Sequence, residues 1–199
     1  YFWLAFHNNL QKNGLGKNNE LFRANYEQWR NDICSFGLGS KFSHTDIGEQ
    51  SAGNIPTIAY YDKYYGQTGW RAITIRSLSI GQGEILVTPL QLCNEAAAIA
   101  NKGWYITPHY NRVDSFQSQI HHISIDSTYF DIVHRGMHRV MTRGTGRWYN
   151  IDSLQLCGKT GTVQNPHGED HAIYIGFAPM ESPKIAIAVV VENAGYGAK

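Results

Sequence analysis

The chain has 199 residues, of which 42% are hydrophobic and 17% are charged, and its formal net charge is +1. This composition excludes an intrinsically disordered chain, and the small net charge gives no indication of binding to nucleic acid or to an anionic membrane surface. No apolar run approaches the roughly 20 residues of a membrane-spanning helix, and no secretory leader is visible. Cys34, Cys93 and Cys157 are too few and too scattered for a disulfide framework or a zinc site. Neither a metal nor a cofactor is therefore expected.

Two helices are expected at the start of the chain. Apolar residues recur at helical spacing in YFWLAFHNNLQK. Asn18 or Asn19 can cap a second helix through residues 20–36, which stops at Gly37. Residues 37–69 are rich in glycine, serine, asparagine and tyrosine, so they are predicted to form one long irregular segment.

The clearest helical signal lies in VTPLQLCNEAAAIANKGW. Thr88 is a candidate N-cap, Pro89 suits the first helical position, and residues 101–103 end the helix. The small residues along one face of this helix let a neighbouring element approach closely. A further helix is expected from Thr128 to Met141, with Ser127 as its N-cap.

Three strands are expected in quick succession after these helices. They are SLQLCGKTGTV, HAIYIGFAP and KIAIAVVVEN, and the connections between them are short enough for hairpins. Helices followed by an antiparallel meander are typical of the α+β class. Alternation along the first strand predicts that Lys159 and Gly161 lie on the face opposite Thr160 and Thr162.

The first of these strands contains the stretch GKTGTVQN, which suits an anion. SLQLCGKT matches a phosphate-binding P-loop except at its opening glycine, where Ser153 stands, but a P-loop also needs a helix that begins at the lysine. On a strand, Lys159 supplies a positive charge, and the hydroxyls of Thr160 and Thr162 can donate to a carboxylate. Gly161 leaves the backbone bare for a ligand. The alternative interpretation of the same residues is an exposed edge strand whose lysine only prevents aggregation.

The residues around this lysine also carry a resemblance to a known family. K-T-G is the third signature of the serine penicillin-recognising enzymes, after S-x-x-K and S-x-N. SLSIGQGEILVTPLQLCNEAAAIANKG resembles the segment before K-T-G in class B penicillin-binding proteins, and HAIYIGFAP and KIAIAVVVENAGYGAK resemble the two strands after it. The likeness is to elongation-type penicillin-binding protein 2. It implies that residues 1–199 are the C-terminal portion of a single transpeptidase domain of the penicillin-binding and serine β-lactamase-like fold.

This resemblance implies a D,D-transpeptidase that cross-links peptidoglycan and that reacts with β-lactams. Lys159 and Thr162 are then catalytic, while Thr160, Gly161 and Thr162 bind the substrate carboxylate. The implied partners are peptidoglycan stem peptides, β-lactam antibiotics and cell-elongation proteins. The implied location is the bacterial inner membrane, with the catalytic domain in the periplasm and the membrane anchor outside this chain.

The nucleophile of that family is missing from the sequence. No serine has a lysine three positions later, so the nucleophilic serine is expected upstream, and the chain alone is expected to be inactive. A non-catalytic binding or interaction module is the alternative from another functional class.

Three further groups of residues have a functional and a structural interpretation. His134 and His138 are four apart on a predicted helix and could hold zinc, although a helix face explains them too. Residues 167–171 could line a cleft or only form a polar turn. The aromatic residues of 60–70 could bind sugars or simply be buried.

Overall fold

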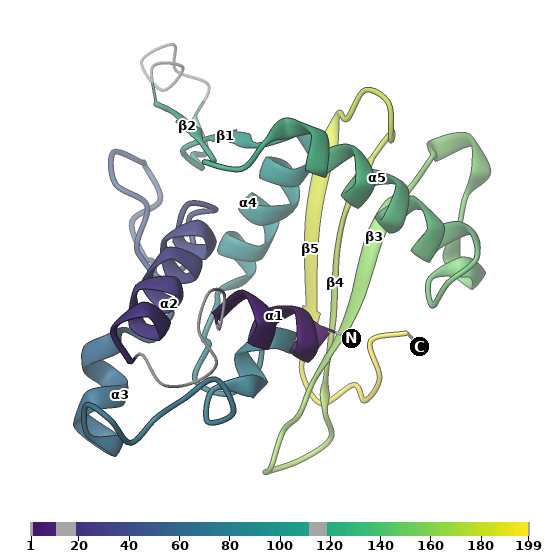
Figure 1. Cartoon of the computed structure of the whole chain (residues 1–199). Coiled ribbons are helices and arrows are strands. Elements are labelled where there is room, and N and C mark those ends of the chain that lie inside the picture. Colours follow the sequence, from purple (N-terminus) through teal and green to yellow (C-terminus); the bar gives the residue numbers. More distant parts are fainter. Residues whose placement is uncertain (1, 11–18, 112–118, 199) are drawn as a thin grey trace. The chain divides into compact units, whose positions relative to one another are not determined.

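The computed structural model describes residues 2–10, 19–111 and 119–198 (Figure 1). The chain forms two compact units. The first consists of Tyr1–Ser40 and Ala52–Val87, and the second of Lys41–Ser51 and Thr88–Lys199. Because the segment 41–51 belongs to the second unit, the chain passes three times between the units before the helix that begins at Pro89.

The first unit is helical and has an aromatic core. Its elements are α1 (Phe2–Leu10), α2 (Asn19–Cys34), α3 (Ile58–Tyr65) and the short 3₁₀ helix η1 (Arg76–Ile80). Tyr26, Tyr61 and Trp70 are almost completely buried and meet at ring-centroid distances of 5.0–5.9 Å. The two N-terminal helices are confirmed, but α2 ends at Cys34 and not at residue 36. Asn19 is the first residue of α2 and not its cap, and Asn18 lies outside the described residues.

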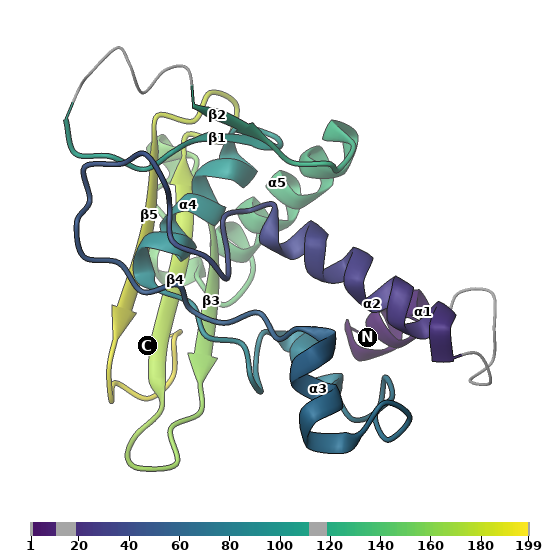
Figure 2. The same cartoon turned by 90° about the vertical axis from the view of Figure 1, so that its left-hand side faces the viewer.

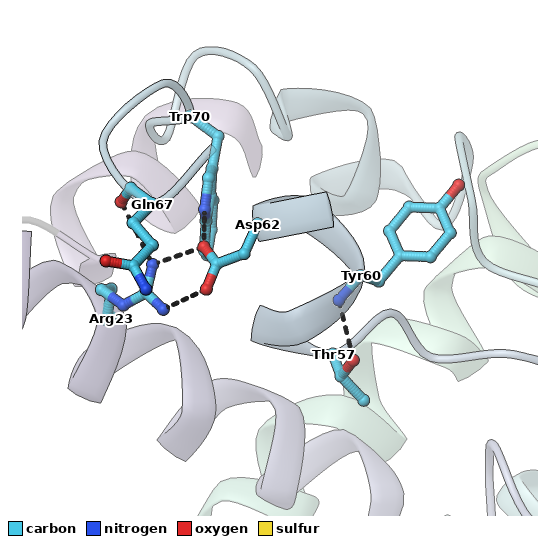
Figure 3. Close-up of polar contacts among 6 residues, drawn as sticks. All are labelled: Arg23, Thr57, Tyr60, Asp62, Gln67 and Trp70. Carbon is cyan, nitrogen blue, oxygen red and sulfur yellow. Dashed lines mark hydrogen bonds and ion pairs between the residues drawn. The ribbon is translucent and has the colours of Figure 1, made fainter. Parts of the chain in front are cut away.

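Helix α3 corrects the prediction of one irregular segment over residues 37–69. Its N-cap is Thr57, whose hydroxyl accepts a hydrogen bond from the Tyr60 backbone N–H at 3.1 Å (Figure 3). Gly66 ends the helix with a positive φ of 73°. The tyrosines that looked like loop composition form this helix because one of them, Tyr61, is buried in the aromatic core.

An ion pair joins α2 to α3 in the first unit. The Arg23 guanidinium donates to both carboxylate oxygens of Asp62, at 2.7 and 2.6 Å, and the Trp70 indole N–H donates to the same carboxylate at 2.9 Å (Figure 3). These hydrogen bonds, first that from Arg23 and then that from Trp70, lower the pKa of Asp62 to about 2.

The second unit begins with helix α4 (Pro89–Ala100), which starts where the sequence predicts. The Thr88 hydroxyl accepts from the Gln91 N–H at 3.2 Å, and the Gln91 side chain accepts from the Thr88 N–H at 3.0 Å, which completes a capping box. The small residues of α4 let it lie against strands β4 (His171–Ala178) and β5 (Ile185–Val191) (Figure 2). The thiol of Cys93 on this helix donates to the Ala186 carbonyl.

Helix α5 (Ser127–Thr142) starts one residue earlier than expected. Its N-cap is Asp126 and not Ser127, because the Asp126 carboxylate accepts from the Thr128 N–H at 2.9 Å. A carboxylate at the start of a helix also interacts favourably with the helix dipole. The helix ends at Thr142, one residue beyond the predicted end at Met141, and Arg143 is its C-cap.

Strands β3 (Cys157–Val163), β4 (His171–Ala178) and β5 (Ile185–Val191) form an antiparallel sheet in the order β3-β4-β5 (Figure 1). The α+β class and the meander are confirmed. The first strand is shorter than predicted, because Asp152–Leu154 is a 3₁₀ turn and Gln155 has a positive φ of 47°.

A second, two-stranded sheet was not predicted. It pairs β1 (Trp104–Ile106) with β2 (Ile120–His122) in antiparallel fashion. Each strand has three residues, which is too short for an alternating pattern to stand out.

Candidate active site

The four residues that the sequence predicts to be catalytic or substrate-binding all lie on strand β3; they are Lys159, Thr160, Gly161 and Thr162. Lys159 pairs with Ile175 of β4, and Thr160 with Tyr174. The Lys159 side chain is exposed, and its ammonium group donates to the Thr160 carbonyl at 2.5 Å. Within the described sheet β3 pairs with β4 alone, so its other edge has backbone groups that a ligand can reach.

The two glycines of the GKTG stretch, Gly158 and Gly161, lie in different packing environments. A Cβ atom on Gly158 would lie 2.2 Å from the Tyr174 hydroxyl oxygen, so any other residue at this position requires the Tyr174 side chain to move. A Cβ atom on Gly161 would meet nothing closer than Ile173, at an ordinary 3.5 Å. Packing therefore favours glycine at position 158, whereas nothing in the packing requires the bare backbone expected at Gly161.

The Thr160 hydroxyl has a partner outside its own strand. It lies 2.8 Å from the hydroxyl of Thr145, in the loop that follows α5. The same loop is held close to the helix, because the Gly146 N–H donates to the Val140 carbonyl at 3.0 Å. Thr145 is exposed to solvent and Thr160 is partly exposed. The contact therefore lies where a ligand of β3 could meet it.

The Thr162 hydroxyl also has a partner far along the chain. It accepts a hydrogen bond from the Gly197 backbone N–H at 3.1 Å. Alternation along β3 puts Thr160 and Thr162 on the same face of the strand. Two hydroxyls with defined partners are thus presented on one face of β3.

Helix α5 fixes the beginning of β3. A ring N–H of His138 donates to the Leu156 carbonyl at 3.0 Å, and the Cys157 thiol contacts the His134 carbonyl at 3.7 Å. The Tyr174 hydroxyl reaches the sulfur of Met141 at 3.6 Å. Burial raises the pKa of the Cys157 thiol to about 11, with a smaller contribution from the charge of Glu181. This thiol therefore serves packing and is unsuited to nucleophilic chemistry.

The P-loop interpretation is wrong. A P-loop requires a helix that starts at the lysine, but the backbone after Lys159 continues as strand β3 to Val163. The helix dipole and the convergent N–H groups that cradle phosphate are consequently lacking at this lysine.

The two histidines of α5 are each bound to a backbone carbonyl. His134 is buried and contacts the Ile99 carbonyl at 2.7 Å, whereas His138 contacts Leu156. Among the described residues no group of three or more potential metal ligands occurs. In the turn before β4, the Asp170 carboxylate accepts from the Asn165 N–H at 3.1 Å, so it shapes the turn.

Comparison with known proteins decides the family. Residues 9–199 match the penicillin binding protein transpeptidase domain. The chain belongs to this transpeptidase family. It is 30% identical to the peptidoglycan D,D-transpeptidase MrdA of Acinetobacter baumannii, over 90% of this chain and 30% of that protein. MrdA of Haemophilus influenzae is also 30% identical, over 88% of this chain and 31% of that protein.

Solved structures of the transpeptidase family agree. The Pseudomonas aeruginosa PBP2 in complex with WCK 5153 is 31% identical, with a TM-score of 0.76, and the match covers 100% of this chain and 43% of that one. PBP2 of Helicobacter pylori is 25% identical with a TM-score of 0.73, over 99% of this chain and 37% of that one. The resemblance to class B penicillin-binding proteins, and to penicillin-binding protein 2 among them, is confirmed. The chain spans about 30% of the length of the curated relatives that it matches.

The roles of Lys159, Thr160, Gly161 and Thr162 in this transpeptidase stay predictions. The structure places them consecutively on one strand and adds two residues that the sequence analysis did not name, Thr145 and Gly197. Gly197 offers no sequence signal, because its contribution is a backbone N–H. The glycines on either side of Thr145 predict a turn after the helix, but they do not indicate its contact with β3.

Proposed function

We propose that the chain is part of a peptidoglycan D,D-transpeptidase and that β3 forms the carboxylate-binding side of its active site. The observation that carries this proposal is K-T-G on an accessible edge strand, with Lys159 exposed and two threonine hydroxyls on one face, in a chain of the transpeptidase family. The whole activity belongs to the longer protein.

The reaction requires a serine that this chain lacks. A serine upstream attacks the penultimate D-alanine carbonyl of a stem peptide, the terminal D-alanine leaves, and an amine of a neighbouring strand resolves the acyl-enzyme. No S-x-x-K occurs in the 199 residues. The isolated chain is therefore expected to bind no penicillin covalently, and a stoichiometric acyl adduct detected by mass spectrometry would contradict this expectation.

The residues of β3 have distinct roles in this proposal. The Lys159 ammonium supplies positive potential next to the substrate carboxylate, and the hydroxyls of Thr160 and Thr162 donate to that carboxylate. The Thr162 backbone N–H is one donor of the oxyanion hole, which stabilises the negative charge that develops on the attacked carbonyl. Gly161 carries no side chain, so a substrate can lie flat against the strand.

The relatives support a proposal for partners and location. The P. aeruginosa protein was solved in complex with WCK 5153, and the H. pylori protein in complex with MreC. We extend to this chain the binding of stem peptides and β-lactams, and cell-elongation partners for the full-length protein. No helix in the described parts of the chain has the length and apolarity needed to cross a membrane. We place the domain in the periplasm, anchored to the inner membrane by another part of the protein.

The proposal is tested by acylation of the full-length protein carrying Lys159→Ala. We expect acylation by penicillin to slow about ten- to hundredfold, because a hydrogen bond to a charged group is lost. Melting should be unchanged, because the side chain is exposed. Lys184→Ala, which removes another exposed lysine of the same sheet region, is the matched control and should acylate normally. If a folded Lys159→Ala protein is acylated at the wild-type rate, Lys159 serves only to prevent aggregation at the edge strand. That result would favour a non-catalytic binding module.

A further inference from the structure

The hydrogen-bond partners of the two β3 threonines determine which way their protons point. A hydroxyl has one proton to donate, and a carboxylate only accepts. A threonine can therefore bind a carboxylate through its O–H only if no other acceptor already takes that proton. Thr162 meets this condition, because its partner, the Gly197 N–H, is a donor and the Thr162 oxygen must accept.

Thr160 meets the same condition only if its partner donates as well. Its partner is the hydroxyl of Thr145, at 2.8 Å, and either of the two oxygens can be the donor. Resting on the function proposed above, we propose that Thr145 is a positioning residue: it donates to Thr160 and so directs the Thr160 proton towards the substrate carboxylate. A hydroxyl that accepts one hydrogen bond also donates more strongly, because such chains are cooperative.

The loop that carries Thr145 is built to hold this hydroxyl in place. A Cβ atom on Gly144 would lie 2.8 Å from the Val140 Cα, and one on Gly146 would lie 2.6 Å from the Met141 sulfur. The Gly144 and Gly146 N–H groups both donate to the Val140 carbonyl, at 3.1 and 3.0 Å. The loop thus packs tightly on the end of α5, and this packing limits the positions that the Thr145 side chain can take.

Further support comes from the strand that faces Thr160. Tyr174 of β4 is the register partner of Thr160, and its hydroxyl contacts Met141 of the same helix end. The end of α5 consequently touches the motif in two ways, through Thr145 directly and through Tyr174 on the neighbouring strand. The contact between the Thr145 and Thr160 hydroxyls is therefore positioned by the packing of the loop on α5 and by the packing of Tyr174 on Met141.

The test is a double-mutant cycle in the full-length protein, with Thr145→Val and Thr160→Val, read as the rate of acylation by penicillin. Valine matches threonine in shape but lacks the hydroxyl. We expect Thr145→Val to slow acylation about fivefold, which is the usual size of one neutral hydrogen bond. In the Thr160→Val background the same change should have no further effect. Thr145→Ser, which keeps a hydroxyl, should recover most of the rate.

Two controls separate this inference from general damage. Thr142→Val removes a hydroxyl three residues earlier, on an exposed residue, that donates to the His138 carbonyl, and should leave acylation unchanged. A penicillin methyl ester has no carboxylate, so Thr145→Val should not alter the rate at which the ester reacts. If Thr145→Val does not fold, as judged by melting, Thr145→Ala takes its place with the same expected loss.

The outcomes also separate this inference from the proposed function. The positioning role is overturned, and the proposed function stands, if Thr160→Val slows acylation but Thr145→Val does not. The same holds if Thr145→Val lowers the acylation rate by the same factor in the Thr160→Val background as in the wild type. If the wild-type full-length protein is not acylated at all, both are overturned. A loss of rate that is equal for the acid and the ester overturns the carboxylate as the group being positioned.

Discussion

The Tyr174 hydroxyl occupies the space that a side chain at position 158 would need. The two are on paired strands, and a Cβ atom on Gly158 would lie 2.2 Å from the hydroxyl oxygen and 2.5 Å from two ring carbons. We expect Gly158→Ala to destabilise the protein by about 1–3 kcal/mol, as overpacking does in a close-packed site. Thermal or denaturant melting measures this, and Tyr174→Phe should not rescue the variant, because the ring carbons remain.

Gly161→Ala is the matched control for that prediction. Its new methyl group would meet Ile173 at a normal contact distance of 3.5 Å. We expect its melting to stay close to wild type, since a Cβ atom is accommodated without movement. Equal destabilisation by both alanine variants would show that the cost comes from the glycine backbone and not from the Tyr174 ring.

The pH dependence of the first unit should depend on Asp62. Its pKa is lowered to about 2, first by the hydrogen bond from Arg23 and then by that from Trp70. A carboxyl whose pKa is lower in the folded state stabilises the fold above its unfolded pKa of about 3.9, and this stabilisation is lost as the pH falls towards 2. We therefore expect melting to drop between about pH 4 and pH 2, and Asp62→Asn to flatten this part of the profile.

A second ion pair provides the comparison for Asp62. Asp131 contacts Lys102 at 2.7 Å, but both side chains are about half exposed, at 51% and 48%. Exposed pairs contribute little, because water already solvates both charges. Asp131→Asn should leave the acid profile nearly unchanged. A profile that loses as much of its slope with Asp131→Asn as with Asp62→Asn would contradict the role given to the Arg23–Asp62–Trp70 cluster.

The three thiols should react with alkylating reagents at different rates. Cys157 is completely buried and has a pKa of about 11, whereas Cys34 and Cys93 are half-buried. Because the thiolate is the reactive form, Cys157 should be alkylated last in the native protein at pH 8. Mass spectrometry of iodoacetamide-treated protein gives the order, and in denaturant the three rates should converge. Early labelling of native Cys157 would show that α5 opens away from β3.

The elements with strong local signals were predictable from the sequence. Helix α4 starts at Pro89 because Thr88 and Gln91 form a capping box, and those letters can be read directly. Helix α3 was missed because its tyrosines owe their conformation to a buried contact between Tyr61 and residues distant in the chain. Composition alone cannot separate that arrangement from a tyrosine-rich loop.

The strand that carries the candidate site was predictable from the sequence, but the residues that contact this strand were not. K-T-G and its neighbours specify β3, because period-two alternation and flanking turns are local properties. The contact of Thr160 with Thr145 spans 15 residues, and that of Thr162 with Gly197 spans 35. Such contacts depend on how α5 and the end of the chain pack on the sheet. No local pattern encodes that packing.

Substitutions at Thr162 separate its backbone from its hydroxyl in the full-length protein. Thr162→Ala removes only the hydroxyl, which accepts from the Gly197 N–H and is proposed to donate to the carboxylate. We expect about a fivefold loss in acylation rate, the size of one hydrogen bond. Thr162→Pro also removes the N–H proposed for the oxyanion hole, where one donor contributes about a hundred- to thousandfold in other enzymes.

Proline can also disturb the strand, since its ring fixes φ at about −65°, away from the φ of an antiparallel strand. Melting must therefore accompany each rate, and only variants that fold are compared. The expected order of acylation rates is wild type, Thr162→Ala, Lys159→Ala and then Thr162→Pro. The acylation rate of Thr162→Ala decides whether the hydroxyl or the backbone N–H of Thr162 matters more. If this variant is as slow as a folded Thr162→Pro, the contribution of Thr162 comes from its hydroxyl, and the oxyanion donor lies elsewhere.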